Sequence, residues 1–238
     1  EKVYARYKAA KDNVEVNWKR IYQEAQKFAT PNRRGGWDGE ATTKGGNKND
    51  SGVYDSTAAL ATKSFVSNTM LALTPTASRW VHLEALEDKT KTKEIDEVNK
   101  TVHQVLQESN FYKAASAAYA DLAIGTGALF LPKGNQKNPL DFTAVPLSQV
   151  YPEQTNRGII GTAFRCYEVT LSELAKDFPE VKANSWFKKL KKEHQDKEDH
   201  KIKIIEASLE GVWDEDVLDT TTGETIPNVP TFGYKYMV

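Results

Sequence analysis

Apolar residues near the start of the chain recur at alternating steps of three and four, the spacing that places side chains on one face of a helix. Charged residues occupy the opposite face, and Pro31 ends the pattern because proline disfavours helical geometry in the residue before it. The spacing predicts a helix over about residues 3–29, within an N-terminal segment 1–31. Its apolar face consists of Val3, Tyr7, Ala10, Val14, Trp18, Ile21, Ala25 and Phe28.

Residues 32–52 are rich in glycine and in polar side chains, with glycine pairs at Gly35-Gly36 and Gly45-Gly46. A segment of this composition buries too little apolar surface to offset the entropy lost on ordering. We therefore expect a mobile loop over residues 32–52.

A second helix is predicted over about residues 55–73. Asp55 and Ser56 are residue types favoured at a helix N-cap, and Pro75 disfavours further helical turns. Small side chains allow two helices to approach closely, so we expect one side of this helix to pack against another helix. That side consists of Ala58, Ala61, Phe65, Thr69 and Ala72.

Two more helices are predicted over about residues 93–108 and 111–123, and they complete a helical part over residues 53–124. The break between them at Ser109-Asn110 indicates a helical hairpin. Residues 79–84, which precede this pair, are predicted to form a short strand.

From Gly125 onward the apolar period changes to short β-prone runs separated by turn residues. A capping box, Thr170-Leu171-Ser172-Glu173, predicts one short helix ending near Pro179, and Thr222-Gly223 predicts a turn between the last two strands. The fold class is therefore α+β, with N-terminal helices followed by a mostly antiparallel sheet region over residues 125–238. The predicted strand segments are 128–131, 140–145, 159–169, 201–213 and 226–236.

The charges of the chain nearly cancel, with 32 Lys and Arg against 33 Asp and Glu. This balance excludes the broad basic surface of a protein that wraps DNA, so any contact with DNA has to be local. Cys166 is the only cysteine, which rules out an intrachain disulfide and fits a reducing compartment. The longest apolar run, Ala128–Leu131, is too short to cross a bilayer, and we expect no membrane partner.

Gly125-Thr126-Gly127 resembles a fragment of a phosphate-binding loop but lacks the Walker spacing and the following Lys-Ser or Lys-Thr. A helix precedes it and a strand follows, the reverse of the order in a P-loop. We interpret these glycines as a sharp helix-to-strand turn in which glycine permits positive φ.

Other groups of chemically active residues fit known site patterns poorly, and no catalytic, cofactor or metal residues are predicted. His194 and His200 lie among acidic residues without metal-ligand spacing. The acidic group Asp214-Glu215-Asp216, followed by Asp219 and Gly223, lacks the glycine offset and closing glutamate of an EF-hand, which favours a solvated turn. Cys166 has no histidine near it in sequence and is interpreted as a packed or edge residue of a strand.

The only basic cluster is formed by Lys188, Lys189, Lys191 and Lys192, next to Trp186-Phe187. Such a cluster can bind backbone phosphates or an acidic patch on a partner. Acidic residues follow closely, and a solvated helix face is the simpler interpretation.

A series of short motifs, in a fixed order, resembles the head-to-tail connecting (portal) proteins of short-tailed, T7-like bacteriophages. The resemblance runs from about Trp18 to Phe178 and includes Leu73-Thr74-Pro75 and Ser109-Asn110-Phe111-Tyr112, motifs that are specific as an ordered series. Trp80 is followed by Val81 where relatives often carry an aromatic residue. The remaining motifs are Ile21, Asp55-Ser56-Thr57-Ala58 with Ala61, Arg79-Trp80, Gly125-Thr126-Gly127, Val145-Pro146-Leu147 and Arg165.

The resemblance implies a structural, non-enzymatic subunit of a dodecameric ring at one capsid vertex of the virion, assembled in the bacterial host cytoplasm. Such a ring carries double-stranded DNA without sequence preference during packaging and ejection, and it docks capsid protein, the terminase motor and tail adaptor proteins. Residues 1–238 would then be mainly the wing region of a portal subunit, without its stem, clip and crown. Because the chain begins without methionine and ends in a predicted strand, we expect the functional protein to be longer. The alternative is a nucleic-acid- or nucleotide-processing enzyme that uses Gly125–Gly127 and Asp214–Asp216.

Overall fold

The structure is a computed structural model that describes residues 2–31, 55–84, 92–132, 139–155, 157–193, 200–218 and 225–237. It confirms the predicted α+β class, with helices first and antiparallel strands later. The chain divides into two compact units: unit 1 is Glu1–Val14 with Gln149–Val238, and unit 2 is Glu15–Ser148. The predicted mobile loop over residues 32–52 lies outside the described residues.

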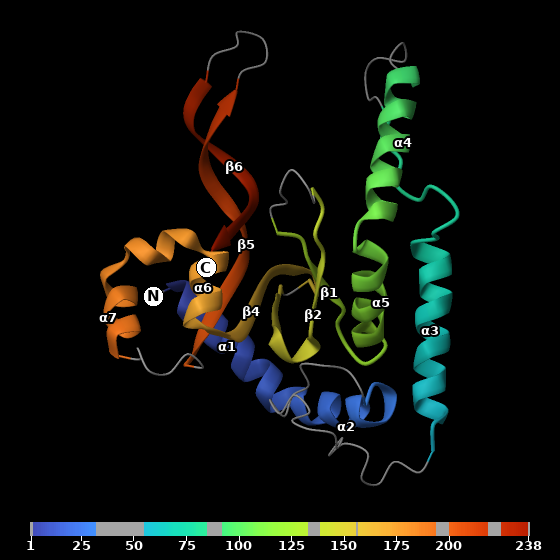
Figure 1. The fold of residues 1–238 in the computed structure, drawn as a ribbon, viewed down its shortest axis with the longest axis horizontal. Coiled ribbons are helices and arrows are strands. Elements are labelled where there is room, and N and C mark those ends of the chain that lie inside the picture. Colours follow the sequence, from blue (N-terminus) through green and yellow to red (C-terminus); the bar gives the residue numbers. More distant parts are fainter. Residues whose placement is uncertain are drawn as a thin grey trace. The chain divides into compact units, whose positions relative to one another are not determined.

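The elements are shown in Figure 1. The helices are α1 (Lys2–Asn17), α2 (Lys19–Ala29), α3 (Thr57–Leu73), α4 (Thr92–Glu108), α5 (Phe111–Leu122), α6 (Leu171–Asp177) and α7 (Ser185–Glu193), with short 3-10 turns η3 (Leu147–Gln149) and η4 (Pro179–Ala183). The strands are β1 (Ala128–Phe130), β2 (Thr143–Val145), β3 (Val150–Gln154), β4 (Ile160–Thr170), β5 (Lys201–Leu218) and β6 (Thr225–Met237).

The prediction of a single N-terminal helix over residues 3–29 is wrong, because the segment forms two helices, α1 and α2, with a break at Trp18. Trp18 has φ −121° and ψ −30°, outside regular helical geometry. The break follows Val14, Val16 and Asn17, residue types that are poorer helix formers than the alanines and lysines before them. The apolar face is divided accordingly: Tyr7 and Val14 are buried, whereas Trp18 is exposed.

Unit 1 is built on a four-stranded antiparallel sheet in the order β3-β4-β5-β6. On one face, the Tyr7 ring of α1 packs edge-on against Tyr151 and Phe164, at centroid distances of 5.7 and 5.9 Å. Arg6 fixes the same helix to the sheet by donating to Glu153 at 3.0 Å and to Thr162 at 3.0 Å. The N-terminal helix thus covers strands formed almost 150 residues later in the chain.

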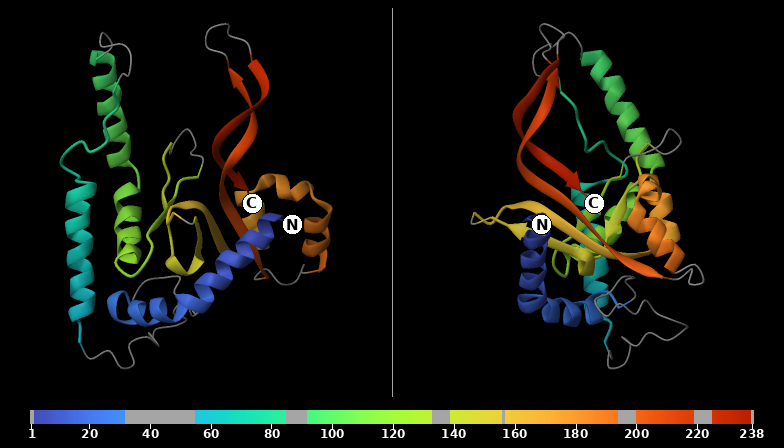
Figure 2. Two further views of the ribbon diagram at one scale, coloured as in Figure 1. Left: turned by 180° about the vertical axis from the view of Figure 1, so that it is seen from behind. Right: turned by 90° about the vertical axis from the view of Figure 1, so that its left-hand side faces the viewer.

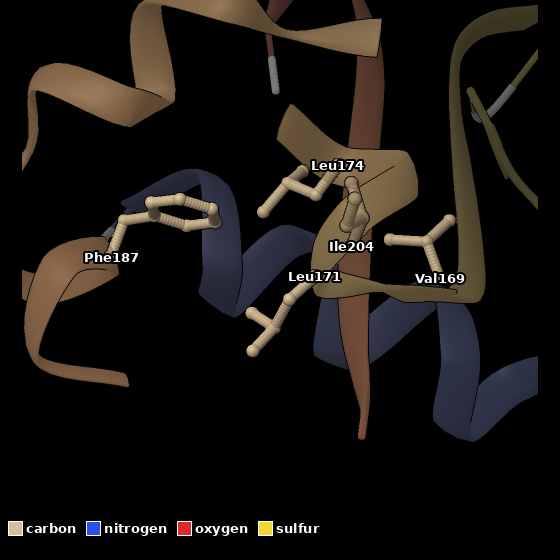
Figure 3. Close-up of a cluster of buried hydrophobic side chains, with 5 residues drawn as sticks. All are labelled: Val169, Leu171, Leu174, Phe187 and Ile204. Carbon is tan, nitrogen blue, oxygen red and sulfur yellow. The ribbon is translucent and has the colours of Figure 1, made fainter. Parts of the chain in front are cut away.

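The opposite face of β4 and β5 carries a cluster of buried apolar side chains (Figure 3). Thr170 and Glu173 form the predicted capping box, which starts α6 at the end of β4. The cap directs the short helix back over the sheet, and η4 and α7 then bring in a phenylalanine. The buried members of the cluster are Val169, Leu171, Leu174, Phe187 and Ile204.

The β5 and β6 strands confirm the predicted segments 201–213 and 226–236, but β5 runs to Leu218. β5 pairs with β4 over Lys201–Ser208 and with β6 over Ala207–Leu218. Its second half therefore forms a two-stranded ribbon with β6 (Figure 1). The predicted turn at Thr222-Gly223 lies outside the described residues.

In unit 2, α3 lies beside α5, and α4 and α5 follow one another end to end (Figures 1 and 2). The helical hairpin predicted for α4 and α5 is therefore wrong. Leu106 and Phe111, on either side of the break, share one apolar cluster with Ala115, Met70 and Phe142. Because these partners come from α3, α5 and the β2 region, the two helices do not need to fold back on each other. The predicted strand at residues 128–131 is β1, and it pairs antiparallel with β2 beside α5.

Residues 79–84 do not form the predicted strand. The backbone of Leu83 instead bonds to one side chain of α4: Leu83 N–H donates to Asn99 Oδ1 at 2.8 Å, and Asn99 Nδ2 donates to the Leu83 carbonyl at 3.1 Å. Asn99 is almost completely buried. An amide side chain has a donor and an acceptor in the same arrangement as a peptide group, so it replaces the partner that a strand would supply.

Candidate assembly surface

α3 exposes large apolar side chains on its outer side, the side that carries Leu60, Phe65 and Leu71. α3 has 17 residues, and Thr62 is the only one that is buried. Leu71 is 72% exposed and Phe65 is 41% exposed, and Leu60 and Leu73 are exposed as well. Lys63 is the only charged residue of the helix. A long, exposed helix that is largely apolar and carries a single charge is typical of a surface that is covered by another protein.

The packing side predicted for α3 is wrong within the chain, since Ala58, Ala61, Phe65 and Ala72 are all exposed. The helix meets its neighbours through the side that carries Thr62. The helix boundaries are as predicted, and its start is held by Asp55, whose carboxylate accepts from the Thr57 amide at 3.0 Å. Hydrogen bonds from the Thr57 hydroxyl and amide lower the pKa of Asp55 below its ordinary value.

Motifs that are far apart in the sequence meet in the core of unit 2. The Trp80 ring stacks on Phe111 at a centroid distance of 5.2 Å, and its indole N–H lies 3.4 Å from the Tyr112 hydroxyl. The buried Thr74 hydroxyl lies 3.4 Å from the Tyr119 hydroxyl. These contacts hold the segment after α3 against α5, which gives the shared motif residues a structural role.

The Ser109-Asn110 motif fixes the corner between α4 and α5. Ser109 Oγ donates to the Leu106 carbonyl at 2.8 Å and accepts from the Phe111 amide at 3.1 Å. Asn110 exchanges hydrogen bonds with the backbone of Phe142, as donor at 2.9 Å and as acceptor at 2.7 Å. The motif therefore joins the helices to the strand region that follows.

The two glycines of Gly125-Thr126-Gly127 are required for close approach. A Cβ at Gly125 would lie 2.6 Å from the Tyr22 ring, and a Cβ at Gly127 would lie 2.5 Å from the Ala118 carbonyl oxygen. The expected positive φ is wrong here: among the described glycines it occurs at Gly158, with φ 78°. The motif does join a helix to a strand as predicted, and the structure shows it packed against Tyr22 and α5.

The residues that would support an enzyme do not converge in the described part of the chain. Cys166 lies within β4 opposite Ile205, and its side chain hydrogen-bonds to Tyr7. Burial, together with this bond, raises the pKa of Tyr7 above its ordinary value. His200 directly precedes β5, while His194 lies outside the described residues. Across the described ranges, no group of three or more His, Cys, Asp and Glu side chains is placed to hold a metal ion.

The acidic group Asp214–Asp216 lies in β5, where Asp214 is opposite Pro230 and Glu215 is opposite Val229. The predicted turn is therefore wrong for these residues, because the β5–β6 pairing continues past them. Asp219 and Gly223 lie outside the described residues.

The basic cluster lies on α7. Phe187 is buried in the unit 1 core, and the four lysines are exposed. Lys189 lies 3.9 Å from Glu193, and both side chains are mainly exposed, so this pair contributes little to stability. The result agrees with a solvated helix face that presents positive charge locally.

The sequence interpretation missed a partly buried charged network around Arg165, in which Glu206 is the buried member. Arg165 lies 3.2 Å from Glu206, its cross-strand partner, and its guanidinium lies over the Tyr167 ring at 4.1 Å. The Tyr167 hydroxyl donates to Glu206 at 2.8 Å. The pKa of Tyr167 is raised above its ordinary value, mainly by burial and to a smaller extent by this hydrogen bond. Arg165 is one of the shared motif residues, but no sequence pattern indicated Glu206 as its partner, because that pairing depends on strand register.

No helix within the described ranges is both long and apolar enough to cross a membrane. No curated protein matches the sequence. Residues 1–210 match the family described as bacteriophage head to tail connecting protein. This match covers most of the chain, including the motifs that pack around Trp80, Phe111 and Gly127. The chain therefore belongs to the bacteriophage head to tail connecting protein family, a structural family of virion components.

Proposed function

We propose that this chain is a subunit of the ring-shaped portal at one capsid vertex of a short-tailed, T7-like phage. The ring is the conduit for genome packaging and ejection, and it docks the packaging motor and then the tail. Residues 1–238 form mainly its wing region. Family membership supports a connecting role within an oligomeric assembly at the head and tail.

The observation that carries this proposal is the exposed outer side of α3. Its apolar side chains have no charged neighbours within the helix except Lys63, although 27% of the whole chain is charged. A subunit that acted alone would leave this surface in water, which is unfavourable by about 25 cal/mol for each Å² of apolar area. Assembly covers such a surface.

Electron microscopy of the full-length protein tests the proposal. Purified protein should form annular oligomers, for which we expect twelve subunits, and mass photometry should give the matching mass. Monomers at every concentration and salt condition would contradict a portal.

Contact with DNA is expected to be weak, local and independent of sequence, because the chain is almost neutral. The exposed lysines of α7 are the described residues best suited to such a contact. A titration with duplexes of different sequence across salt concentrations should show low affinity that falls as salt increases. A sequence-selective complex of nanomolar affinity at high salt would point to a dedicated DNA-binding protein.

A further inference from the structure

We propose that the outer face of α3 packs against an exposed apolar stripe on α2 of a second copy of this chain. The α3 face is defined as Leu60, Ala61, Ser64, Phe65, Asn68, Leu71 and Ala72. The α2 stripe is defined as Trp18, which precedes the helix, with Ile21, Ala25 and Phe28. The proposal rests on the portal function, and it names the surfaces by which neighbouring subunits meet.

The α3 face combines two properties of a helix contact. Ala61, Ser64 and Ala72 are small, which allows a second helix to approach within the usual 8 to 10 Å between axes. Leu71 and Phe65 flank these small residues and offer large apolar side chains. The face contains no charge, so its burial leaves no ion without a partner.

The α2 stripe is a second exposed apolar surface in the same unit. No residue of α2 is buried, and Ile21 is 55% exposed. The Trp18 ring stacks on Tyr22 at a centroid distance of 6.0 Å, and Tyr22 packs on Gly125. These contacts hold one end of the stripe against the turn that contains Gly125.

Two different surfaces on one subunit are what a closed ring requires. In a head-to-tail contact, a patch on one copy meets a different patch on the next copy, and rotation closes the series. A charged partner surface would lose its hydration against the α3 face, whereas the side chains of the α2 stripe are apolar. The Lys27 ammonium lies over the Phe28 ring at one end of the stripe, 5.8 Å from its centroid.

The area of the α3 face is enough for one part of a subunit contact and too small for a whole one. At 1.5 Å per residue, α3 is about 25 Å long, and a face about 10 Å wide covers about 250 Å². A stable interface takes about 800 Å² from each partner. A single substitution in the α3 face should therefore weaken ring assembly without unfolding the subunit.

The first test uses glutamate substitutions in the full-length protein. Leu71→Glu and Ile21→Glu should each raise the concentration needed for ring assembly at least about tenfold, the equivalent of 1.4 kcal/mol. Val98→Glu is the matched control, because Val98 is also an exposed apolar residue on a helix of unit 2. It should leave assembly unchanged, and all three variants should unfold at the wild-type temperature as dissociated subunits. Normal assembly of Leu71→Glu would overturn the inference.

The second test locates the contact by cross-linking in a Cys166→Ser background, which removes the only native cysteine. Chains with Ala61→Cys and chains with Ile21→Cys are mixed, assembled and treated with a short bismaleimide. A cross-linked dimer should form in the mixture and in neither population alone. A dimer from Ala61→Cys chains alone, or no dimer from assembled rings, would overturn the α3–α2 pairing while leaving the portal function intact. If wild-type protein forms no ring, the proposed function itself fails, and the pairing fails with it.

Discussion

Two alanine-rich helices lie side by side in unit 2, and only one of them has its alanines in the core. α5 buries Phe111, Ala114, Ala115 and Ala118, whereas no alanine of α3 is buried. The two helices have similar composition, so the difference comes from their neighbours. Among the described elements, α5 is surrounded by α3, α4, β1 and β2, while the main neighbours of α3 are α5 and α2.

The comparison shows that a helix of small and apolar residues does not have to be a core helix. Such a helix indicates close packing, but the partner can belong to the same chain or to another copy. In α5 the close approach is internal, since the Ala118 carbonyl leaves no room for a Cβ at Gly127. In α3 the corresponding surface is open to solvent in the subunit.

The same substitution on the two helices should give the largest contrast. Phe111→Ala removes a buried ring that contacts Trp80 and Phe142, and it should lower the free energy of unfolding by about 3 to 5 kcal/mol. Phe65→Ala should lower it by only about 1 kcal/mol, since 41% of that residue is exposed. Urea unfolding of the dissociated subunits measures both values. Equal losses would show that α3 is packed within the subunit after all.

Enlarging an alanine on each helix should give a somewhat smaller contrast. Ala115 is completely buried, so Ala115→Leu should cost about 1 to 3 kcal/mol through overpacking. Ala61→Leu should remain within about 0.5 kcal/mol of the wild type in the dissociated subunit. Thermal unfolding of the two variants checks this, and a lower unfolding temperature for Ala61→Leu would contradict the exposed position of Ala61.

Two asparagines, one buried in unit 2 and one exposed on α3, test whether polar side chains also differ in their contribution to stability. Asn99→Ala leaves the backbone of Leu83 without its two hydrogen bonds and should cost about 1 to 3 kcal/mol. Asn68→Ala on the outer side of α3 should have almost no effect. Hydrogen exchange should also show faster exchange of the Leu83 amide in the first variant, and unchanged exchange there would mean that Asn99 does not hold this segment.

The smallest effects concern the helix starts. Hydrogen bonds from the Thr57 hydroxyl and amide lower the pKa of Asp55, and bonds from the Thr170 amide and hydroxyl lower that of Glu173. A carboxyl group whose pKa is lowered in the folded state stabilises the fold when it is ionised. This stabilisation is fully present above the unfolded-state pKa, near 4, and is lost as pH falls through the folded-state pKa. Wild type and Glu173→Gln should therefore differ slightly in unfolding temperature at pH 7 and converge at low pH. A difference that grew on acidification would have the wrong sign for a stabilising carboxylate.

The positions of most helices and strands were predictable because they depend on local patterns. The capping box at Thr170 and the apolar period of α4 and α5 are local, and both predictions are confirmed. β3 was missed because it is short and contains Pro152. Proline is tolerated there because β3 is an edge strand, a fact that depends on sheet order.

The errors concern features that depend on distant partners. Asn99 replaces the strand partner of Leu83, and no local pattern of residues 79–84 reveals it. The outer side of α3 was predicted to be its packing side because a row of small residues has the same sequence pattern whether its partner helix belongs to the same chain or to another one. The family motifs are of two kinds: Trp80 and Phe111 pack in the core of unit 2, whereas others, such as Ile21 and Ala61, are exposed, and the motifs alone do not distinguish the two.

The packing of α1 on the sheet sets the order in which the chain can fold during synthesis. Arg6 meets Glu153, which is 147 residues later, and Tyr7 packs on Phe164. A ribosome releases all of Glu15–Ser148 before any strand of the unit 1 sheet, so unit 2 can form its contacts first. Throughout that interval the buried side of α1, with Tyr7, Ala10 and Val14, has no sheet to cover it, which leaves this helix open to aggregation and chaperone binding.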